Sequence, residues 1–167
     1  MHHLIKQFFI LSVLILSGLG IQAQETSFST AITAGPTTPI LDNGLGLHLG
    51  VNPAYAISPF LSLEGQLSYL YTFAGTTFLT GEEINGQAVN ILAGGRVYLL
   101  SEERKNRVYL NLLLGGNYNR EAARDVITSE WNLGFSLGGY LKRNRFLIGL
   151  SYDTPQNVIL KVGYILR

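Results

Sequence analysis

The chain has 167 residues, which is enough for one domain, and it contains no cysteine. The lack of cysteine excludes disulfides, a lipidated N-terminal cysteine and thiolate metal sites. Once Lys6 is set aside with the N-terminal segment, the remaining 11 basic residues balance 11 acidic ones, so no charge excess favours nucleic acid as a partner.

The N-terminal segment MHHLIKQFFILSVLILSGLGIQAQ is typical of a secretory signal peptide. Lys6 precedes an apolar stretch from Phe8 to about Gly20, and Ala23 provides a small residue before the expected cleavage point. The alternative is a membrane anchor helix, but the apolar stretch is shorter than the roughly 20 residues that a spanning helix needs. The sequence therefore predicts a signal peptide at residues 1–23 and an exported domain at residues 24–167.

The exported domain consists of short segments in which apolar and polar residues alternate, as in half-buried strands. In the last segment, for example, Val158, Leu160 and Val162 share one face, while Ile159 and Lys161 share the other. The sequence predicts eight such strands, at about residues 26–34, 46–57, 60–73, 87–100, 107–119, 130–142, 145–153 and 158–167.

The connections between these strands alternate in length. Short links at residues 58–59, 101–106 and 143–144 alternate with mostly longer ones at 35–45, 74–86, 120–129 and 154–157. Short turns at one end and longer loops at the other predict an all-β fold, an eight-stranded antiparallel up-and-down transmembrane β-barrel. Both termini are then expected on the periplasmic side of the outer membrane of a Gram-negative bacterium.

The expected outward faces discriminate between a membrane barrel and a soluble one. Between the two rims these faces carry almost only Leu, Val and Ile, and no charge falls in the middle, where one would cost about 2–4 kcal/mol. Aromatic residues gather at the rims, as in the girdles of membrane barrels. The predicted girdle residues are Tyr69, Tyr71, Tyr118, Trp131 and Tyr152 at the outer rim and Tyr55, Phe146 and Tyr164 at the inner rim. A secreted, soluble, lipocalin-like carrier is the alternative, and it would require the same apolar faces to point inward.

Three charged residues are expected in the lumen of the barrel. Glu64, Arg96 and Lys161 all fall on lumenal faces, and Glu64 and Arg96 lie on neighbouring strands. Because an unpaired charge in a closed interior is costly, we expect either one shared polar network or separate solvation of each group by trapped water. Paired glycines at 94–95, 115–116 and 138–139 are expected to relieve crowding in the strands, and an eight-stranded lumen is expected to be filled by side chains.

On these patterns, the exported domain resembles the small eight-stranded outer-membrane barrels: the OmpA transmembrane domain, OmpX and the broad porin-like families. ISPFLSLEGQLSY (57–69) is similar to their tight turn and following strand, and KVGYILR (161–167) resembles their assembly signal, with Arg167 in the place of the terminal aromatic residue. SEERKNRVYLNLLLGG (101–116) has a weaker similarity to TraO, an envelope protein of conjugative elements. The resemblance implies outer-membrane lipid and lipopolysaccharide, the barrel-assembly machinery and periplasmic chaperones as partners.

The expected function is non-enzymatic: a structural role, or binding or adhesion through the outer loops at the cell surface, where an extracellular ligand could be held. The candidate loop contacts are Glu82, Glu83, Arg120, Glu121, Arg124 and Asp125. Some barrels of this type resemble lipid A-modifying enzymes, which need a histidine near lipid, but His48 is expected in the lumen. One histidine in the exported domain and scattered carboxylates predict no metal site, and no cofactor is expected.

Overall fold

The computed structural model describes residues 28–39, 42–77, 83–99, 106–123, 126–155 and 157–166. The predicted signal peptide, residues 1–23, lies outside these ranges. Among the described residues, no helix is long and apolar enough to cross a membrane.

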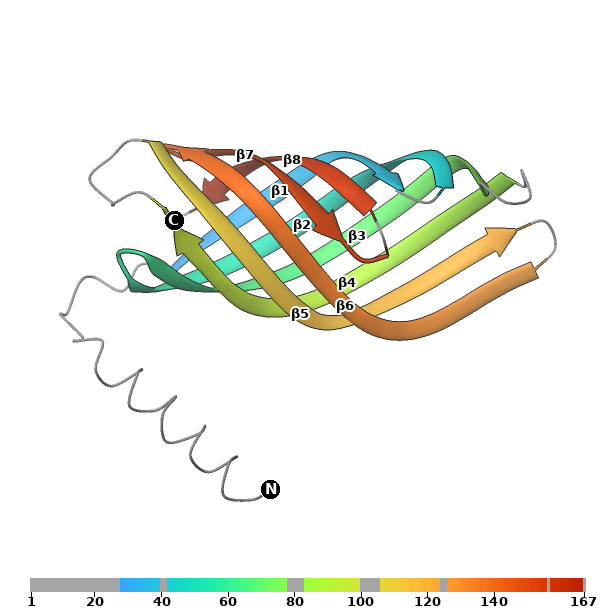
Figure 1. Cartoon of the computed structure of the whole chain (residues 1–167), viewed down its shortest axis with the longest axis horizontal. Coiled ribbons are helices and arrows are strands. Elements are labelled where there is room, and N and C mark those ends of the chain that lie inside the picture. Colours follow the sequence, from blue (N-terminus) through green and yellow to red (C-terminus); the bar gives the residue numbers. More distant parts are fainter. Residues whose placement is uncertain are drawn as a thin grey trace, which may run out of the picture.

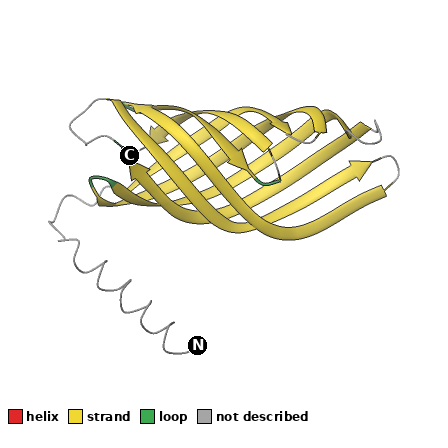
Figure 2. Cartoon of the chain, in the orientation of Figure 1, coloured by secondary structure: helices red, strands yellow, loops and turns green. Residues whose placement is uncertain are grey.

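Eight antiparallel strands form one closed barrel, in which each strand pairs with its neighbours in the chain and the last pairs with the first (Figures 1 and 2). The strands are β1 (Phe28–Pro39), β2 (Asp42–Ser58), β3 (Leu61–Thr77), β4 (Glu83–Tyr98), β5 (Asn106–Ala123), β6 (Val126–Arg143), β7 (Phe146–Asp153) and β8 (Asn157–Leu166). The predicted fold class and the number of strands are confirmed.

The alternation of side chains also follows the prediction. Along β8, Leu160, Val162 and Tyr164 are exposed on the outer surface, while Ile159 and Lys161 are fully buried in the lumen. The large exposed side chains on the other strands are also predominantly Leu, Val, Ile and aromatic residues. A soluble barrel would have the opposite arrangement, so the lipocalin-like alternative is wrong.

The outer loops are shorter in the structure than the sequence predicts. Strand pairing continues through most of them: Thr37 still pairs with Gly46, Thr76 with Glu83, and Ala123 with Val126. The prediction failed because it relied on alternating hydrophobicity, and most residues on both faces of these extensions are polar or small. Backbone pairing alone continues there, and it leaves no such pattern in the sequence.

The strands differ greatly in length, and this difference shapes one end of the barrel. β5 and β6 have 18 residues each, whereas β7 has 8 and β8 has 10. As a result, the β5–β6 hairpin continues well past the β7–β8 turn (Figure 1). We call the part formed by residues 118–123 and 126–133 the projecting ribbon.

Candidate functional site

Two buried ion pairs lie in the lumen among the residues that the structure describes. In the first, Glu64 on β3 faces Arg96 on β4, with a guanidinium nitrogen 2.9 Å from Oε1 and Nε donating to Oε2 over 3.0 Å. Amide nitrogens of Asn111 and Asn52 also donate to this carboxylate, over 3.2 and 3.3 Å. The structure thus brings together two of the three charged residues expected in one network, and it fills the remaining acceptor sites of the carboxylate with amides.

The second ion pair joins Lys161 on β8 to Asp153 on β7, with 2.9 Å between Nζ and Oδ2. Ser136 donates to the other carboxylate oxygen over 2.6 Å, and the side-chain nitrogen of Gln66 donates to Oδ2 over 2.9 Å. All four side chains are buried. Every hydrogen bond to this carboxylate therefore comes from inside the barrel.

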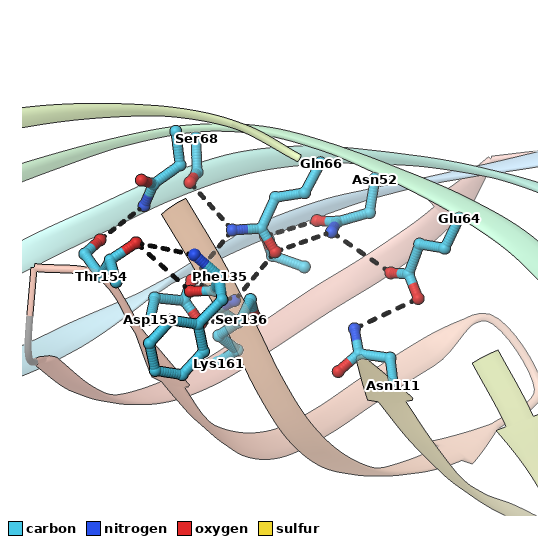
Figure 3. A network of polar contacts seen from close by, with 12 residues as sticks. Asn52, Glu64, Gln66, Ser68, Asn111, Phe135, Ser136, Asp153, Thr154 and Lys161 are labelled. Carbon is cyan, nitrogen blue, oxygen red and sulfur yellow. Dashed lines mark hydrogen bonds and ion pairs between the residues drawn. The ribbon is translucent and has the colours of Figure 1, made fainter. Parts of the chain in front are cut away.

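Lys161 does not contact Glu64 directly. The amides connect the two pairs, because Asn52 donates to both Glu64 and Gln66, and Gln66 accepts from Lys161 over 3.3 Å (Figure 3). Asp153 was not among the site residues expected from the sequence. Its lumenal position on the strand next to that of Lys161 was the signal that could have identified it.

Buried apolar clusters lie on both sides of the two ion pairs along the barrel. At the short-turn end, Tyr98, Tyr109 and Tyr140 pack with Ala31, Leu147 and Ile165. The rings of Tyr109 and Tyr140 are stacked 4.9 Å apart, and the Arg96 guanidinium lies 4.3 Å from the Tyr109 ring centre. Towards the other end, Leu70, Ala88 and Ile159 form a second buried cluster. The lumen is therefore a packed interior, as expected for eight strands.

Paired glycines allow this packing. A Cβ atom at Gly94 would lie 2.1 Å from the backbone oxygen of Leu112, and one at Gly115 would lie 2.1 Å from that of Ile91. At Gly95, by contrast, a Cβ atom would meet nothing within 4 Å. In these pairs the lumenal glycine permits a close backbone approach, which is the relief of crowding predicted from the sequence.

His48 is buried in the lumen, as expected, and neither ring nitrogen has a hydrogen-bond partner among the described residues. A histidine that acts on lipid must reach the outer surface, so this position does not suit the lipid A-modifying alternative. The described residues also contain no group of three or more His, Asp or Glu side chains that could hold a metal ion.

The aromatic residues predicted for the girdles lie on the outer surface. Tyr55, Tyr69, Tyr71, Trp131, Phe146 and Tyr164 are exposed, while Tyr118 and Tyr152 are half-buried. Several of them form pairs across neighbouring strands: Tyr118 with Trp131, at 5.3 Å between ring centres, and Phe146 with Tyr164, at 5.5 Å.

The candidate loop contacts lie partly in strands. Arg120 and Glu121 are in β5, and Glu83 begins β4, so the expectation that they lie in loops is wrong for these three. Glu82, Arg124 and Asp125 lie outside the described residues. The outward face of the ribbon pairs Tyr118 with Trp131 and Arg120 with Ser129, whereas its inward face carries Asn119, Glu121, Glu130 and Asn132.

The projecting ribbon has one edge without a partner. β6 pairs with β7 only from Ser136 to Arg143, and no described strand pairs with residues 126–135 on that side. Phe135 is the last residue held there, since its N–H donates to the Thr154 hydroxyl and its carbonyl accepts from the Thr154 N–H, both over 3.0 Å. Because backbone direction alternates along a strand, Leu133, Trp131 and Ser129 also direct their N–H and C=O groups to this free edge.

No protein-family model matches the sequence, and no curated protein matches it. Solved structures do match. Neisserial surface protein A has a TM-score of 0.56 at 13% identity, with 86% of this chain and 99% of that chain covered. The outer membrane enzyme PagL has a TM-score of 0.54 at 12% identity, covering 83% and 98%.

Ail, the attachment invasion locus protein of Yersinia pestis, has a TM-score of 0.50 at 15% identity, covering 84% of this chain and 97% of that chain. At these identities the likeness concerns the fold alone. Together with the apolar outer surface, it shows that this chain has the fold of the small eight-stranded β-barrels of the outer membrane.

Proposed function

We propose that the protein is a non-enzymatic surface-binding barrel, in which the packed barrel is a rigid support and the projecting ribbon is the binding element. The observation that carries the proposal is the free edge of β6 at residues 126–134. An exposed strand edge offers unpaired N–H and C=O groups on which an extended segment of another protein can add as a further strand.

The position of the edge relative to the membrane supports this proposal. Within hydrocarbon, an open strand edge leaves backbone groups unsatisfied at a cost of several kcal/mol each, so open edges do not face lipid. The exposed polar residues Thr128, Ser129 and Glu130 also suit water. The end of the ribbon therefore belongs outside the bilayer, where a partner can reach it.

This proposal includes an orientation. The short turns and both termini face the periplasm, and the ribbon faces the exterior. In that orientation the outer surface contacts phospholipid and lipopolysaccharide, and biogenesis uses periplasmic chaperones and the barrel-assembly machinery. The similarity of residues 101–116 to TraO, and with it a role in conjugative transfer, stays a prediction.

Because the partner is unidentified, the experiment uses a defined probe. The mature protein in nanodiscs is screened against phage-displayed random peptides, and the enriched peptides are then measured on two variants. Ser129→Pro removes an edge N–H that faces away from β5, a position where an edge strand tolerates proline. Ser129→Ala changes only the side chain and serves as the matched control.

We expect enriched peptides with strand-forming, alternating sequences that bind wild type and Ser129→Ala equally but bind Ser129→Pro at least tenfold more weakly. Equal binding to Ser129→Pro, or no enrichment over empty nanodiscs, would contradict the proposal. Heat-modifiable gel migration confirms that each variant is a folded barrel.

A further inference from the structure

The β6–β7 turn, at the short-turn end of the barrel, carries an exposed basic group beside two aromatic rings. Arg143 ends β6 and Arg145 lies in the turn, and both are exposed. Phe146 is 66% exposed, and its ring lies edge-on against that of Tyr164 with an interplanar angle of 77°. The four residues form one patch because Arg143 pairs with Phe146, which in turn pairs with Tyr164.

Both arginines have guanidinium donors to spare. One nitrogen of Arg145 donates to the Tyr164 hydroxyl over 3.3 Å, which holds this side chain beside the rings. Arg143 forms no ion pair or hydrogen bond with a described residue. Each guanidinium has five N–H donors in a fork that matches a phosphate, and most of these donors have no partner among the described residues.

The carboxylates in the part of the chain that the structure describes lie away from this patch. Of the carboxylates in the part of the chain that the structure describes, Glu64 and Asp153 are lumenal and ion-paired, and Asp42, Glu83, Glu121 and Glu130 belong to the opposite half of the strands. None of them is on the strand ends at the β6–β7 turn. Arg143 and Arg145 are thus an uncompensated pair of cations among these residues.

The position of the patch along the membrane normal indicates which kind of ligand it contacts. Next to the patch, the outward side chains are Leu141, Ile148 and Val162, which form a hydrocarbon-facing wall. Aromatic rings in this position mark the level of the lipid headgroups. Arg143 pairs with Phe146 at the level of these rings, and Arg145 lies in the turn beyond them, close to the level at which the phosphates of a bilayer are found.

We propose that this patch binds the headgroup of an anionic glycerophospholipid, with Arg143 and Arg145 on the phosphate and with Phe146 and Tyr164 against the glycerol and the first methylene groups. In the orientation proposed above, the lipid belongs to the periplasmic leaflet of the outer membrane. The binding itself does not depend on that orientation or on the ribbon.

The test measures the association of spin-labelled phosphatidylglycerol and phosphatidylcholine with the mature protein in vesicles by electron paramagnetic resonance. An arginine near an anionic surface increases the affinity for anionic lipid about fivefold. Wild type should therefore associate with phosphatidylglycerol several-fold more strongly than with phosphatidylcholine, and high salt should weaken this preference. The double variant Arg143→Gln/Arg145→Gln should lower it to near one. Arg120→Gln, which removes one charge from the opposite half of the barrel, is the control and should leave most of it.

Two results would overturn the proposal. One is an unchanged preference in the folded double variant, and the other is no preference in wild type. A third arm replaces phosphatidylglycerol with lipid A, whose phosphates belong to the other leaflet. A stronger arginine-dependent association with lipid A would refute the assignment to a glycerophospholipid. Peptide binding to the ribbon is measured separately, so failure here is distinguishable from failure of the proposed function.

Discussion

At the scale of single residues, the buried ion pair of Lys161 and Asp153 has the clearest energetic consequence. Both side chains are fully buried, and the carboxylate receives further hydrogen bonds from Ser136 and Gln66. Removing one member leaves an uncompensated buried charge, which typically costs about 3–5 kcal/mol. Loss of either partner alone is therefore expected to destabilise the barrel, even though the intact pair adds little net stability.

We predict that Lys161→Met lowers the free energy of unfolding by about 3–5 kcal/mol, because the Asp153 carboxylate stays buried without its ammonium partner. The double variant Lys161→Met/Asp153→Asn should recover part of this loss, since no unpaired charge remains. Urea unfolding of the barrel in lipid vesicles measures both. Additive losses in the double variant would contradict the coupling.

A second residue-scale prediction concerns neighbouring glycines. Gly94→Ala places a Cβ atom against the Leu112 backbone, whereas Gly95→Ala places one in open space. We expect the first variant to lose at least about 2 kcal/mol of stability, in the range of overpacked interiors, and the second to change little. The same unfolding experiment checks the pair, and equal effects would show that the β4–β5 approach is not tight.

At the scale of elements, β5 and β6 have two parts with different surroundings. Leu114 on β5 lies on the apolar outer wall, whereas Ile127 on β6 lies in the projecting ribbon, although both are more than half exposed. Exposure alone does not indicate whether a side chain faces lipid or water. The free strand edge beside Ile127 indicates that this residue faces water, because an open edge is not tolerated in hydrocarbon.

We predict that Leu114→Arg destabilises the barrel in bilayers by about 2–4 kcal/mol, as a charge near the middle of a lipid-facing wall does. Ile127→Arg should cost at most about 1 kcal/mol, because its side chain lies in water. Comparison of the two variants in vesicle unfolding tests where the bilayer ends. A large cost for Ile127→Arg would bring the ribbon into the membrane.

Some features of the strands were predictable from the sequence and others were not. The alternation of apolar and polar residues was sufficient to predict eight strands and their outward faces. It also predicted the lumenal position of Glu64, Arg96 and Lys161, because lipid and lumen impose opposite polarity on successive residues. It could not give the ends of β5 and β6, where apolar and polar residues no longer alternate. Alternation also puts Asp153 in the lumen on the strand next to that of Lys161, but the ion pair itself depends on which rotamers fit the filled lumen.

At the scale of the whole molecule, the two ion pairs lie between two buried apolar clusters. The tyrosine layer of Tyr98, Tyr109 and Tyr140 closes one end, and the cluster of Leu70, Ala88 and Ile159 lies towards the other. Ions that cross the barrel would have to displace packed side chains and exchange partners with both ion pairs.

We therefore predict that the purified barrel shows no steady ion conductance in planar lipid bilayers. A variant with less material in the tyrosine layer, Tyr109→Ala/Tyr140→Ala, should admit water to that end and raise the frequency of brief current steps. Sustained conductance of the wild-type protein would contradict the packed lumen.

The placement of the two ion pairs has a consequence for insertion into the membrane. Glu64 and Arg96 belong to the β3–β4 hairpin, and Asp153 and Lys161 belong to the β7–β8 hairpin, so each carboxylate has its cation on the adjoining strand. A hairpin that enters the bilayer before closure can carry its lumenal charges as a neutral unit. Neutralisation of this kind lowers the electrostatic barrier to translocation, and the amides of Asn52 and Gln66 then join the two hairpins when β8 reaches β1.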